Sequence, residues 1–539
     1  MYIIERITRR VNKAVTVFFF KVSLLLLELS QKIFYHLLCE VVGLICINGE
    51  NLKLNDVVKV ARYREKVALD DEARIKVKKS RETIEKLLRT GKVIYGVNTG
   101  FGALVNKRIS KEDLLALQRN IVLSHSAGVG KALEEEIVRA IMLLRANSLA
   151  KGFSGVRVEV IEKLLEFLNE DITPYVPEMG SVGASGDLAP LSHIALSLIG
   201  EGYVLCEDGR VQTKEVLKHK GIKPIALEEK EGLSLVNGTQ AMTAILALVV
   251  HDAKNLMKVA TLISAISIDA LLGSSQPFDP RIHMVRPYNG QKKIAEFLFN
   301  CLEKSEIRNS HRGCSKVQDA YSLRTIPQVY GAVLDTLDYA EKILEIEMNS
   351  ATDNPLVFDE DVISGGNFHG EPIALVCDYL AIALTDMGNM IERRIDRLVN
   401  PLVNADLPPF LAEGKEGLNS GYMLWQYTAA AICNENKVLS HPASSDTIPT
   451  SALQEDHVSM GMNAARKLKK IFENLITLVA IEAMLASVAI RKRRPLKSCD
   501  EVEIMVDKIN NVLGKGSDRF VLDEFERVRD IIISEIKKI

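Results

Sequence analysis

Apolar residues recur every three to four positions over much of the chain, which predicts amphipathic α-helices. The clearest helical segments cover residues 111–128, 134–152 and 157–171. Strand signals are few and concentrate in residues 201–213. Residues 91–102 are rich in glycine and predict a loop. The pattern therefore predicts a mainly α-helical protein.

One helical segment is apolar on nearly every face. It runs from residue 239 to residue 273, within the region 233–490, which is dominated by helix-forming residues. Such a helix is buried in a bundle or an oligomer, because none of its faces suits water. It contains ionisable residues, among them His251, Asp252, Lys254 and Asp269. Ionisable residues are rare in membrane-spanning helices, so we predict a long central helical bundle.

Residues 1–46 form an N-terminal apolar extension, and Lys21, Glu28, Lys32 and Glu40 interrupt its apolar stretch from residue 14 onward. A membrane-spanning helix needs about 20 apolar residues with few charges. A secretory signal needs an unbroken apolar core and a small-residue cleavage site. Neither pattern is present. Three interpretations remain: an added amphipathic helix, a membrane-surface anchor, or an upstream start that is not the native one.

The rest of the chain divides into three predicted parts. Residues 47–232 combine strand signals with helices and predict a smaller, mixed N-terminal domain. Residues 233–490 form the predicted central long-helix bundle. Residues 491–539 are charged and amphipathic, so we expect a C-terminal helical segment that packs on the outside.

Composition limits the possible partners and compartments. The chain has 539 residues, 47% of them apolar and 26% charged, as in ordinary soluble proteins. Its net charge of -2 and a lone basic block at residues 491–494 provide little basis for binding nucleic acid. The eight cysteines form no C-x-x-C pair, which argues against a zinc site or a disulfide framework. We therefore expect a protein of the reducing cytoplasm.

The stretch GSVGASGDLAPLSHIAL, residues 180–196, places small residues just before a predicted helix. One interpretation is a helix start, with Ser185 as N-cap and Asp187 in the first turn. A second interpretation is chemical. The amide nitrogen of Gly186 attacks the carbonyl carbon of Ala184, and loss of two waters, one from the Ser185 hydroxyl, leaves an electrophilic ring. Glycine allows this approach because it has no Cβ.

A series of further blocks supports the chemical interpretation. They are VIYGVNTGFG, LQRNIVLSHSAGVG, RANSLAKGFSG, KEGLSLVNGTQA, VQDAYSLRTIPQV, TDNPLVF, SGGNFHGEPIA, GLNSGYM and ENKVLSHPASSDTIPTSALQEDHVSMG. In type and order they resemble the aromatic amino-acid ammonia-lyases, and within that family the histidine-specific members. The resemblance runs from about Ile47 to the C-terminus. It leaves residues 1–46 outside, which favours a non-native start and makes membrane attachment unexpected.

The resemblance implies elimination of ammonia from L-histidine to give trans-urocanate, the first step of histidine degradation. The electrophile would be a 4-methylidene-imidazol-5-one group formed autocatalytically from Ala184, Ser185 and Gly186. No external cofactor and no metal are expected. The resemblance also implies a homotetramer whose active sites are shared between chains.

The same resemblance implies roles for individual residues. Tyr95 and Tyr321 resemble two essential tyrosines, one of which acts as the base. Arg324 resembles the arginine that binds the substrate carboxylate, a task that suits its bidentate fork. Three further residues resemble groups around the carboxylate and the prosthetic ring: Asn237, Gln318 and Phe368. Two questions stay open: which tyrosine is the base, and whether the substrate amine or its ring attacks the electrophile.

Two positions bear on substrate choice. His125, which follows Ser124, resembles the position where family members select the side chain they accept. Glu455 resembles the acidic residue that histidine-specific members set against the imidazole. The chain departs from the family pattern at Tyr288 and Thr325, where histidine and cysteine are expected. Neither position has a named role.

Taken singly, these residues have simpler explanations. Tyr95 alone is a structural loop tyrosine, and Tyr321 is an ordinary helix residue. His193 is expected to be a satisfied core residue, and His441 and His457 are not at metal-ligand spacing. The alternatives are a phenylalanine or tyrosine lyase, an aminomutase, and an inactive scaffold that keeps the fold without the chemistry.

Overall fold

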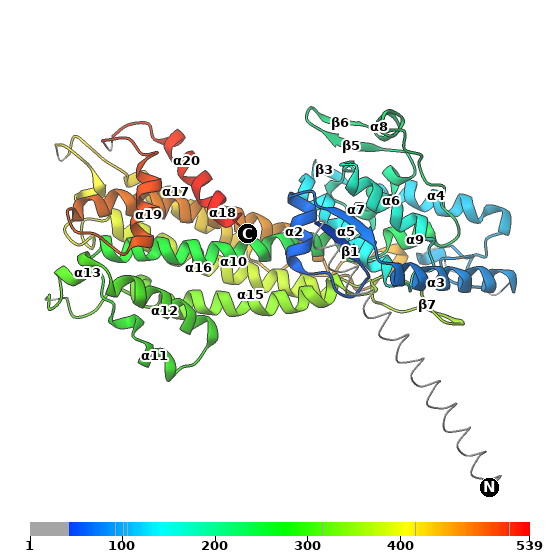
Figure 1. The fold of residues 1–539 in the computed structure, drawn as a ribbon, viewed down its shortest axis with the longest axis horizontal. Coiled ribbons are helices and arrows are strands. Elements are labelled where there is room, and N and C mark those ends of the chain that lie inside the picture. The colour runs from blue at the N-terminus through cyan, green and yellow to red at the C-terminus, as the bar shows by residue number, and fades with distance from the viewer. Residues whose placement is uncertain are drawn as a thin grey trace, which may run out of the picture.

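The computed structural model describes residues 43–538, except residues 92, 101, 105, 315, 416 and 517. Of the predicted extension 1–46, residues 1–42 lie outside this range. The described chain is mainly α-helical, as the hydrophobic pattern predicts. It has a mixed part built largely from N-terminal segments and an elongated bundle of long helices (Figure 1). The boundaries proposed near residues 46, 232 and 490 stay predictions.

The strands of the described residues form four small two-stranded sheets. β1 (Leu44–Ile47) pairs in parallel with β2 (Lys66–Leu69), and α2 (Leu54–Arg62) connects them. The antiparallel pairs are β3 (Val129–Ala132) with β4 (Pro177–Met179), β5 (Tyr203–Cys206) with β6 (Gly209–Gln212), and β7 (Leu356–Phe358) with β8 (Asp361–Ile363). The β5–β6 hairpin confirms the strand prediction at 201–213.

The helices of the mixed part follow the predicted periodic segments. They are α3 (Asp71–Arg89), α4 (Leu114–His125), α5 (Glu135–Ala150), α6 (Val158–Asn169), α7 (Leu188–Leu198), α8 (Thr213–Lys220) and α9 (Glu231–Val236). Single 3-10 turns occur at Gly102–Leu104, Lys111–Asp113, Gln276–Phe278, Pro409–Leu411, Ser451–Leu453 and Arg491–Arg493. Helices α4, α5 and α6 confirm the three predicted segments between residues 111 and 171.

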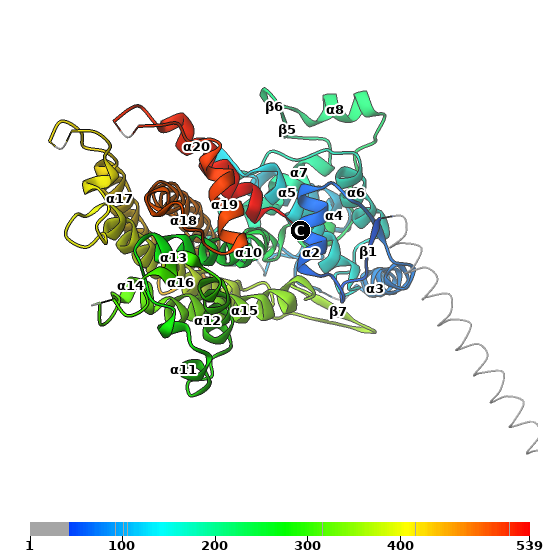
Figure 2. The same cartoon turned by 60° about the vertical axis from the view of Figure 1, so that its left-hand side comes forward.

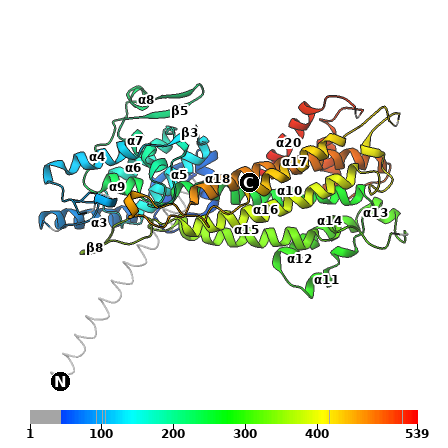
Figure 3. The same ribbon diagram turned by 180° about the vertical axis from the view of Figure 1, so that it is seen from behind.

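Four long helices make the bundle: α10 (Gln240–Ala270), α15 (Ile326–Met348), α16 (Glu371–Val399) and α18 (Gly461–Ile490). They run side by side, and α10 contacts the other three (Figures 2 and 3). Along α10 only Lys254, Asn255, Lys258 and Leu262 are not buried, which confirms the prediction for this apolar segment. Shorter helices complete the bundle: α11 (Pro280–Met284), α12 (Asn289–Glu303), α13 (Glu306–Ser310), α14 (Tyr321–Arg324), α17 (Met423–Leu439), α19 (Asp500–Asn510) and α20 (Leu522–Ile536).

A fully buried ion pair lies in the bundle core. Arg394 on α16 donates from Nε to Glu482 on α18 at 2.6 Å, and both side chains are inaccessible to solvent. Ser267 on α10 donates to the same carboxylate at 2.7 Å. A buried charge is tolerated only when it is paired and hydrogen-bonded, so this network ties three long helices in one register.

Two helices in the described part of the chain, Glu371–Val399 and Gly461–Arg493, are long and apolar enough to cross a membrane. Within their apolar windows, 67% and 89% of the residues are buried inside the fold. Burial of this extent is what packing in the bundle requires.

The structure also joins Cys301 and Cys499 by a disulfide. The bridge contradicts the expectation that the cysteines form no disulfide, which rested on their spacing in the sequence, whereas these two residues are 198 positions apart.

Candidate active site

The Ala-Ser-Gly loop lies between β4 and α7, and packing against the start of α10 determines its shape. Gly186 has a φ of +71°, and a Cβ at this position would lie 2.1 Å from the carbonyl oxygen of Gly238. The backbone N–H of Asp187 donates to the same carbonyl oxygen at 2.6 Å. Both the left-handed backbone and the close approach require glycine at position 186.

A second contact holds the loop from the side of α18. Gly183 has a φ of +70°, and a Cβ there would lie 2.1 Å from Oγ of Ser459. Ser459 donates to the Gly183 carbonyl at 3.2 Å, and the Met460 N–H donates to the Val182 carbonyl at 2.9 Å. Ala184 is buried against Met460. The loop is therefore clamped between two segments that are distant in the chain.

Asp187, not Ser185, is the N-cap residue of α7, so the interpretation of Ser185 as N-cap is wrong. The Asp187 carboxylate accepts the N–H groups of Ala241 and Met242, each at 2.9 Å, and the Ser181 hydroxyl at 2.8 Å. These tertiary bonds take the place of a local cap on α7. Burial raises the pKa of Asp187 to about 6, and the hydrogen bonds oppose that shift.

The residues around the loop fit a prosthetic ring closed from Ala184 to Gly186. Asn237 donates from Nδ2 to the Ser185 carbonyl at 2.9 Å, and Arg145 fixes the Asn237 backbone by donating to its carbonyl at 2.8 Å. Oδ1 of Asn237 is buried and has no hydrogen-bond partner among the described residues. Leaving a buried polar atom unpaired costs about 1–3 kcal/mol of stability. Oδ1 of Asn237 can therefore accept a hydrogen bond from a further polar group at the loop.

Glu455 reaches the same loop. The Ser185 hydroxyl donates to Oε1 of Glu455 at 3.1 Å, and the Thr450 hydroxyl donates to Oε2 at 2.5 Å. Before Glu455 the chain makes a turn at Ser451–Leu453, where three successive non-glycine residues have positive φ. Such backbone strain persists only where the surrounding structure imposes it. The turn aims the Glu455 carboxylate at Ser185.

His125 ends α4 near this carboxylate. Its Nδ1 lies 3.0 Å from the Ser124 hydroxyl. Burial lowers the pKa of His125, and the negative charge of Glu455 opposes this shift. The neutral imidazole is therefore favoured at pH 7, with one ring nitrogen able to accept a hydrogen bond and the other able to donate one.

Tyr95 and Phe368 lie beside the same segments. The Tyr95 hydroxyl accepts the Gly102 N–H at 3.3 Å, and a Cβ on Gly102 would lie 2.3 Å from Oγ of Ser451. Phe368 is half-buried just before α16, and a Cβ on the nearby Gly370 would lie 3.0 Å from Oγ of Ser459. Both aromatic residues thus belong to the end of the fold that holds the Ala-Ser-Gly loop.

Three predicted residues lie elsewhere. Gln318 and Tyr321 are exposed, and Tyr321 retains 69% of its accessible surface. Arg324 stacks over the Tyr321 ring at 4.8 Å, and its Nε atom is buried without a hydrogen-bond partner among the described residues. These residues lie on or beside α14, at the opposite end of the bundle from α7 (Figures 2 and 3). A single chain therefore holds only part of the predicted site.

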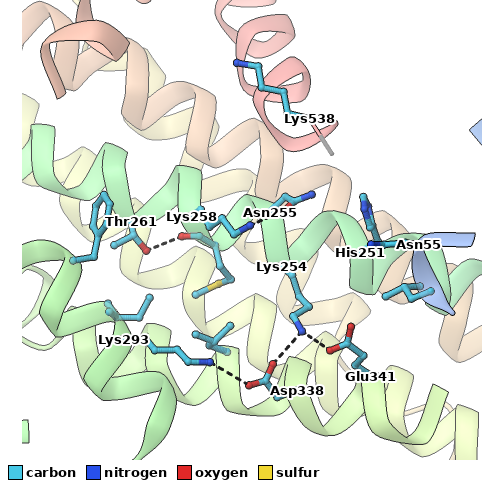
Figure 4. A pocket seen from close by; sticks show the side chains of 15 residues that line it. Asn55, His251, Lys254, Asn255, Lys258, Thr261, Lys293, Asp338, Glu341 and Lys538 are labelled. Carbon is cyan, nitrogen blue, oxygen red and sulfur yellow. Dashed lines mark hydrogen bonds and ion pairs between the residues drawn. The ribbon is translucent and has the colours of Figure 1, made fainter. Parts of the chain in front are cut away.

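A cavity of ≈ 720 Å³ lies between α10, α12 and α15 (Figure 4). Inside it, Lys254 pairs with Asp338 at 3.2 Å and also with Glu341. The lining contains none of the predicted site residues. This cavity is therefore not the candidate active site.

Sequence reasoning assigned no role to three residues that shape the loop: Ser181, Thr450 and Ser459. The Ser459 hydroxyl donates to Gly183, 276 residues away in the chain, whereas the partners of Ser181 and Thr450 lie six and five residues away. Asp187 directly follows the Ala-Ser-Gly triad, so its position in the chain was a usable signal. Its bonds to the first turn of α10 carried no signal, because they span more than 50 residues.

Comparisons with known proteins show the family of this chain. The aromatic amino acid lyase family matches residues 52–511. A histidine ammonia-lyase of Caldanaerobacter subterraneus subsp. tengcongensis is 51% identical over 490 residues, covering 90% of this chain and 93% of that protein. The crystal structure of histidine ammonia-lyase from Trypanosoma cruzi is similar with a TM-score of 0.83 at 38% identity, covering 92% of this chain and 95% of that chain. The tyrosine aminomutase of Streptomyces globisporus gives a TM-score of 0.86 at 39% identity, covering 91% and 97%. The chain belongs to the aromatic amino acid lyase family.

Proposed function

We propose that this protein is a histidine ammonia-lyase, which eliminates ammonia from L-histidine to give trans-urocanate. The observation that carries the proposal is the placement of Glu455 at the Ser185 hydroxyl, 3.1 Å away, with His125 within its electrostatic reach. A carboxylate accepts an imidazole N–H, whereas a phenyl ring offers no donor. Relatives named histidine ammonia-lyase at 51% and 49% identity support the same substrate.

The prosthetic group of the proposed enzyme is the methylidene-imidazolone for which this family is known. It would form from Ala184, Ser185 and Gly186 and supply an electrophile that draws electrons from the substrate. Asn237 would hold it through the loop carbonyl that it already binds. Gly186 keeps the backbone bent toward Gly238.

The other residues bind the substrate or move protons. Arg324 would bind the substrate carboxylate, with its unpaired Nε available as a donor. Glu455 and His125 would orient the imidazole. Tyr95 or Tyr321 would remove the β-proton, after which the C–N bond breaks, the C=C bond forms and ammonia leaves.

We propose a homotetramer in which Tyr321 and Arg324 of one copy complete the site of another. Two features support this assembly. The α14 residues are exposed and distant from the loop of their own chain. In addition, α17 buries only Ala429 and Asn436. Three large apolar side chains on α17 are exposed: Leu424, Tyr427 and Val438. Exposed apolar surface of this kind marks an interface.

The proposal also includes a cytoplasmic location and no nucleic-acid partner.

The test is a comparison of the purified protein on histidine, phenylalanine and tyrosine. We expect the conjugated product and ammonia from histidine, with kcat/KM at least about 10²-fold above that for phenylalanine. Comparable turnover of phenylalanine would overturn the substrate assignment. A β-amino acid product would place the protein with the aminomutases.

A further inference from the structure

Two histidines and a glutamate meet beside the candidate active site. Nδ1 of His457 lies 3.4 Å from Nε2 of His369, and the two rings stack with centroids 5.4 Å apart. Glu371 begins α16 next to them. One ligand atom from each residue lies within 4.8 Å of the other two. Spacing along the chain did not predict this group, because His369 and His457 are 88 residues apart.

The hydrogen bonding of this cluster is incomplete. Oε2 of Glu371 is buried and has no hydrogen-bond partner among the described residues. Nε2 of His369 lies 3.3 Å from the His457 carbonyl, and Nδ1 of His369 accepts the Glu371 N–H at 3.4 Å. Contacts of this length are weak. A carboxylate oxygen and two weakly engaged imidazoles thus lie within 4.8 Å of one another.

We propose that His369, Glu371 and His457 bind one divalent transition-metal ion, for which Zn²⁺ is the best match. Two imidazoles and one carboxylate are ligands that suit Zn²⁺, and three protein ligands leave a fourth position for water. Zinc bonds of about 2.0–2.2 Å require the ligand atoms to draw together. The exposed side chain of His457 can make that adjustment.

The proposed ion would join two segments of the candidate site. His457 follows Glu455 by two residues, and His369 follows Phe368 directly. Binding therefore stabilises the segment that presents Glu455 to Ser185, against the start of α16. Because the ligand set depends only on the fold, the inference does not depend on which amino acid is the substrate.

The experiment is equilibrium dialysis of chelator-treated, full-length protein against Zn²⁺, with bound metal measured by mass spectrometry. We expect one Zn²⁺ per chain. Binding should be at least about tenfold weaker in Glu371→Gln and in His457→Ala, because each variant lacks one ligand. A tenfold change corresponds to about 1.4 kcal/mol of binding free energy. His441→Ala changes an exposed histidine outside the cluster and should bind like the parent.

Thermal unfolding provides a readout that needs no activity. Zn²⁺ should raise the unfolding midpoint of the parent and of His441→Ala, and leave that of His457→Ala unchanged, because a ligand stabilises only the state that binds it. Since His457 is exposed, this variant is expected to fold. Equal Zn²⁺ binding by the parent, Glu371→Gln and His457→Ala would overturn the proposal, as would binding of no Zn²⁺ by the parent.

Discussion

Oγ of Ser185 lies 3.1 Å from Oε1 of Glu455, although 270 residues separate them in the chain. The Thr450 hydroxyl holds the other carboxylate oxygen at 2.5 Å. The hydroxyl that ring closure must remove and the carboxylate that we assign to substrate recognition are therefore neighbours. We expect maturation of the loop and recognition of the imidazole to depend on the same short segment, residues 450–455.

Replacing Ser185 by alanine tests the prosthetic group. In the parent protein, the peptide that spans Ala184 to Gly186 should be lighter than its sequence mass by two waters. Ser185→Ala should show no such loss and should lower kcat by on the order of 10³-fold or more, since the electrophile is absent. Peptide mass spectrometry and a steady-state assay measure both effects. Unmodified peptide in fully active enzyme would contradict the assignment.

Mixed oligomers test the shared site. Ser185→Ala removes the loop hydroxyl, and Tyr321→Phe removes a hydroxyl on α14, at the opposite end of the bundle. Each variant alone should be nearly inactive. When the two variants are co-expressed, some sites combine an intact loop from one copy with an intact Tyr321 from another. Activity should therefore return to roughly a quarter of the parent if chains mix at random and two chains supply the site.

The control for this experiment co-expresses Ser185→Ala with Asn237→Ala, since both changes lie at the same loop. This pair should recover far less activity than the first. No recovery by either pair would show that each site is built within a single chain. Equal recovery by the two pairs would contradict the proposed sharing of Tyr321 between chains.

Gly186→Ala tests the close approach to Gly238. The alanine Cβ would meet the Gly238 carbonyl oxygen at 2.1 Å, in addition to the strain of a φ of +71°. Gly221→Ala is a matched control, because Gly221 has a φ of +69° and no atom within 4 Å of its Cβ position. The control should lose about 1–2 kcal/mol from backbone strain alone. Gly186→Ala should lose more stability, and its loop should remain unmodified by mass. Equal losses for the two variants would refute this account.

His125→Leu and Glu455→Gln test substrate choice. Each removes a hydrogen-bonding group from the imidazole, at a cost of about 1–3 kcal/mol or 5- to 150-fold in kcat/KM for histidine. The two-water mass loss at residues 184–186 should persist in His125→Leu. Asp456→Asn, which changes an exposed neighbour, should be near the parent. Unchanged kcat/KM in both test variants would remove Glu455 and His125 from the specificity site.

Asp269 predicts a pH dependence of stability. Burial raises its pKa from 3.8 to about 6, although the Ser305 hydroxyl donates to it at 2.8 Å. The folded state therefore binds the proton more tightly than the unfolded state. Stability is lost as pH rises through the interval from 4 to 6, by about 1 kcal/mol between pH 5 and pH 7. Thermal midpoints should show that Asp269→Asn loses this part of the dependence, whereas the exposed change Asp507→Asn retains it.

Much of the secondary structure follows from local pattern. Residues 239–273 lack a polar face, and α10 is indeed buried along nearly its whole length. The hairpin at 201–213 and helices α4 to α6 also match the sequence-based expectations. These predictions succeed because residues three to four positions apart on a helix share a face whatever the rest of the chain does.

The sequence by itself determined the helical elements, the family and the Ala-Ser-Gly stretch, because each depends on residues that are close in the chain. Only the tertiary structure decided that Asp187 binds the first turn of α10 and that Glu455 meets Ser185. It also placed Tyr321 at the far end of the bundle. Such contacts join segments tens to hundreds of residues apart, and they depend on how whole helices pack rather than on any local propensity.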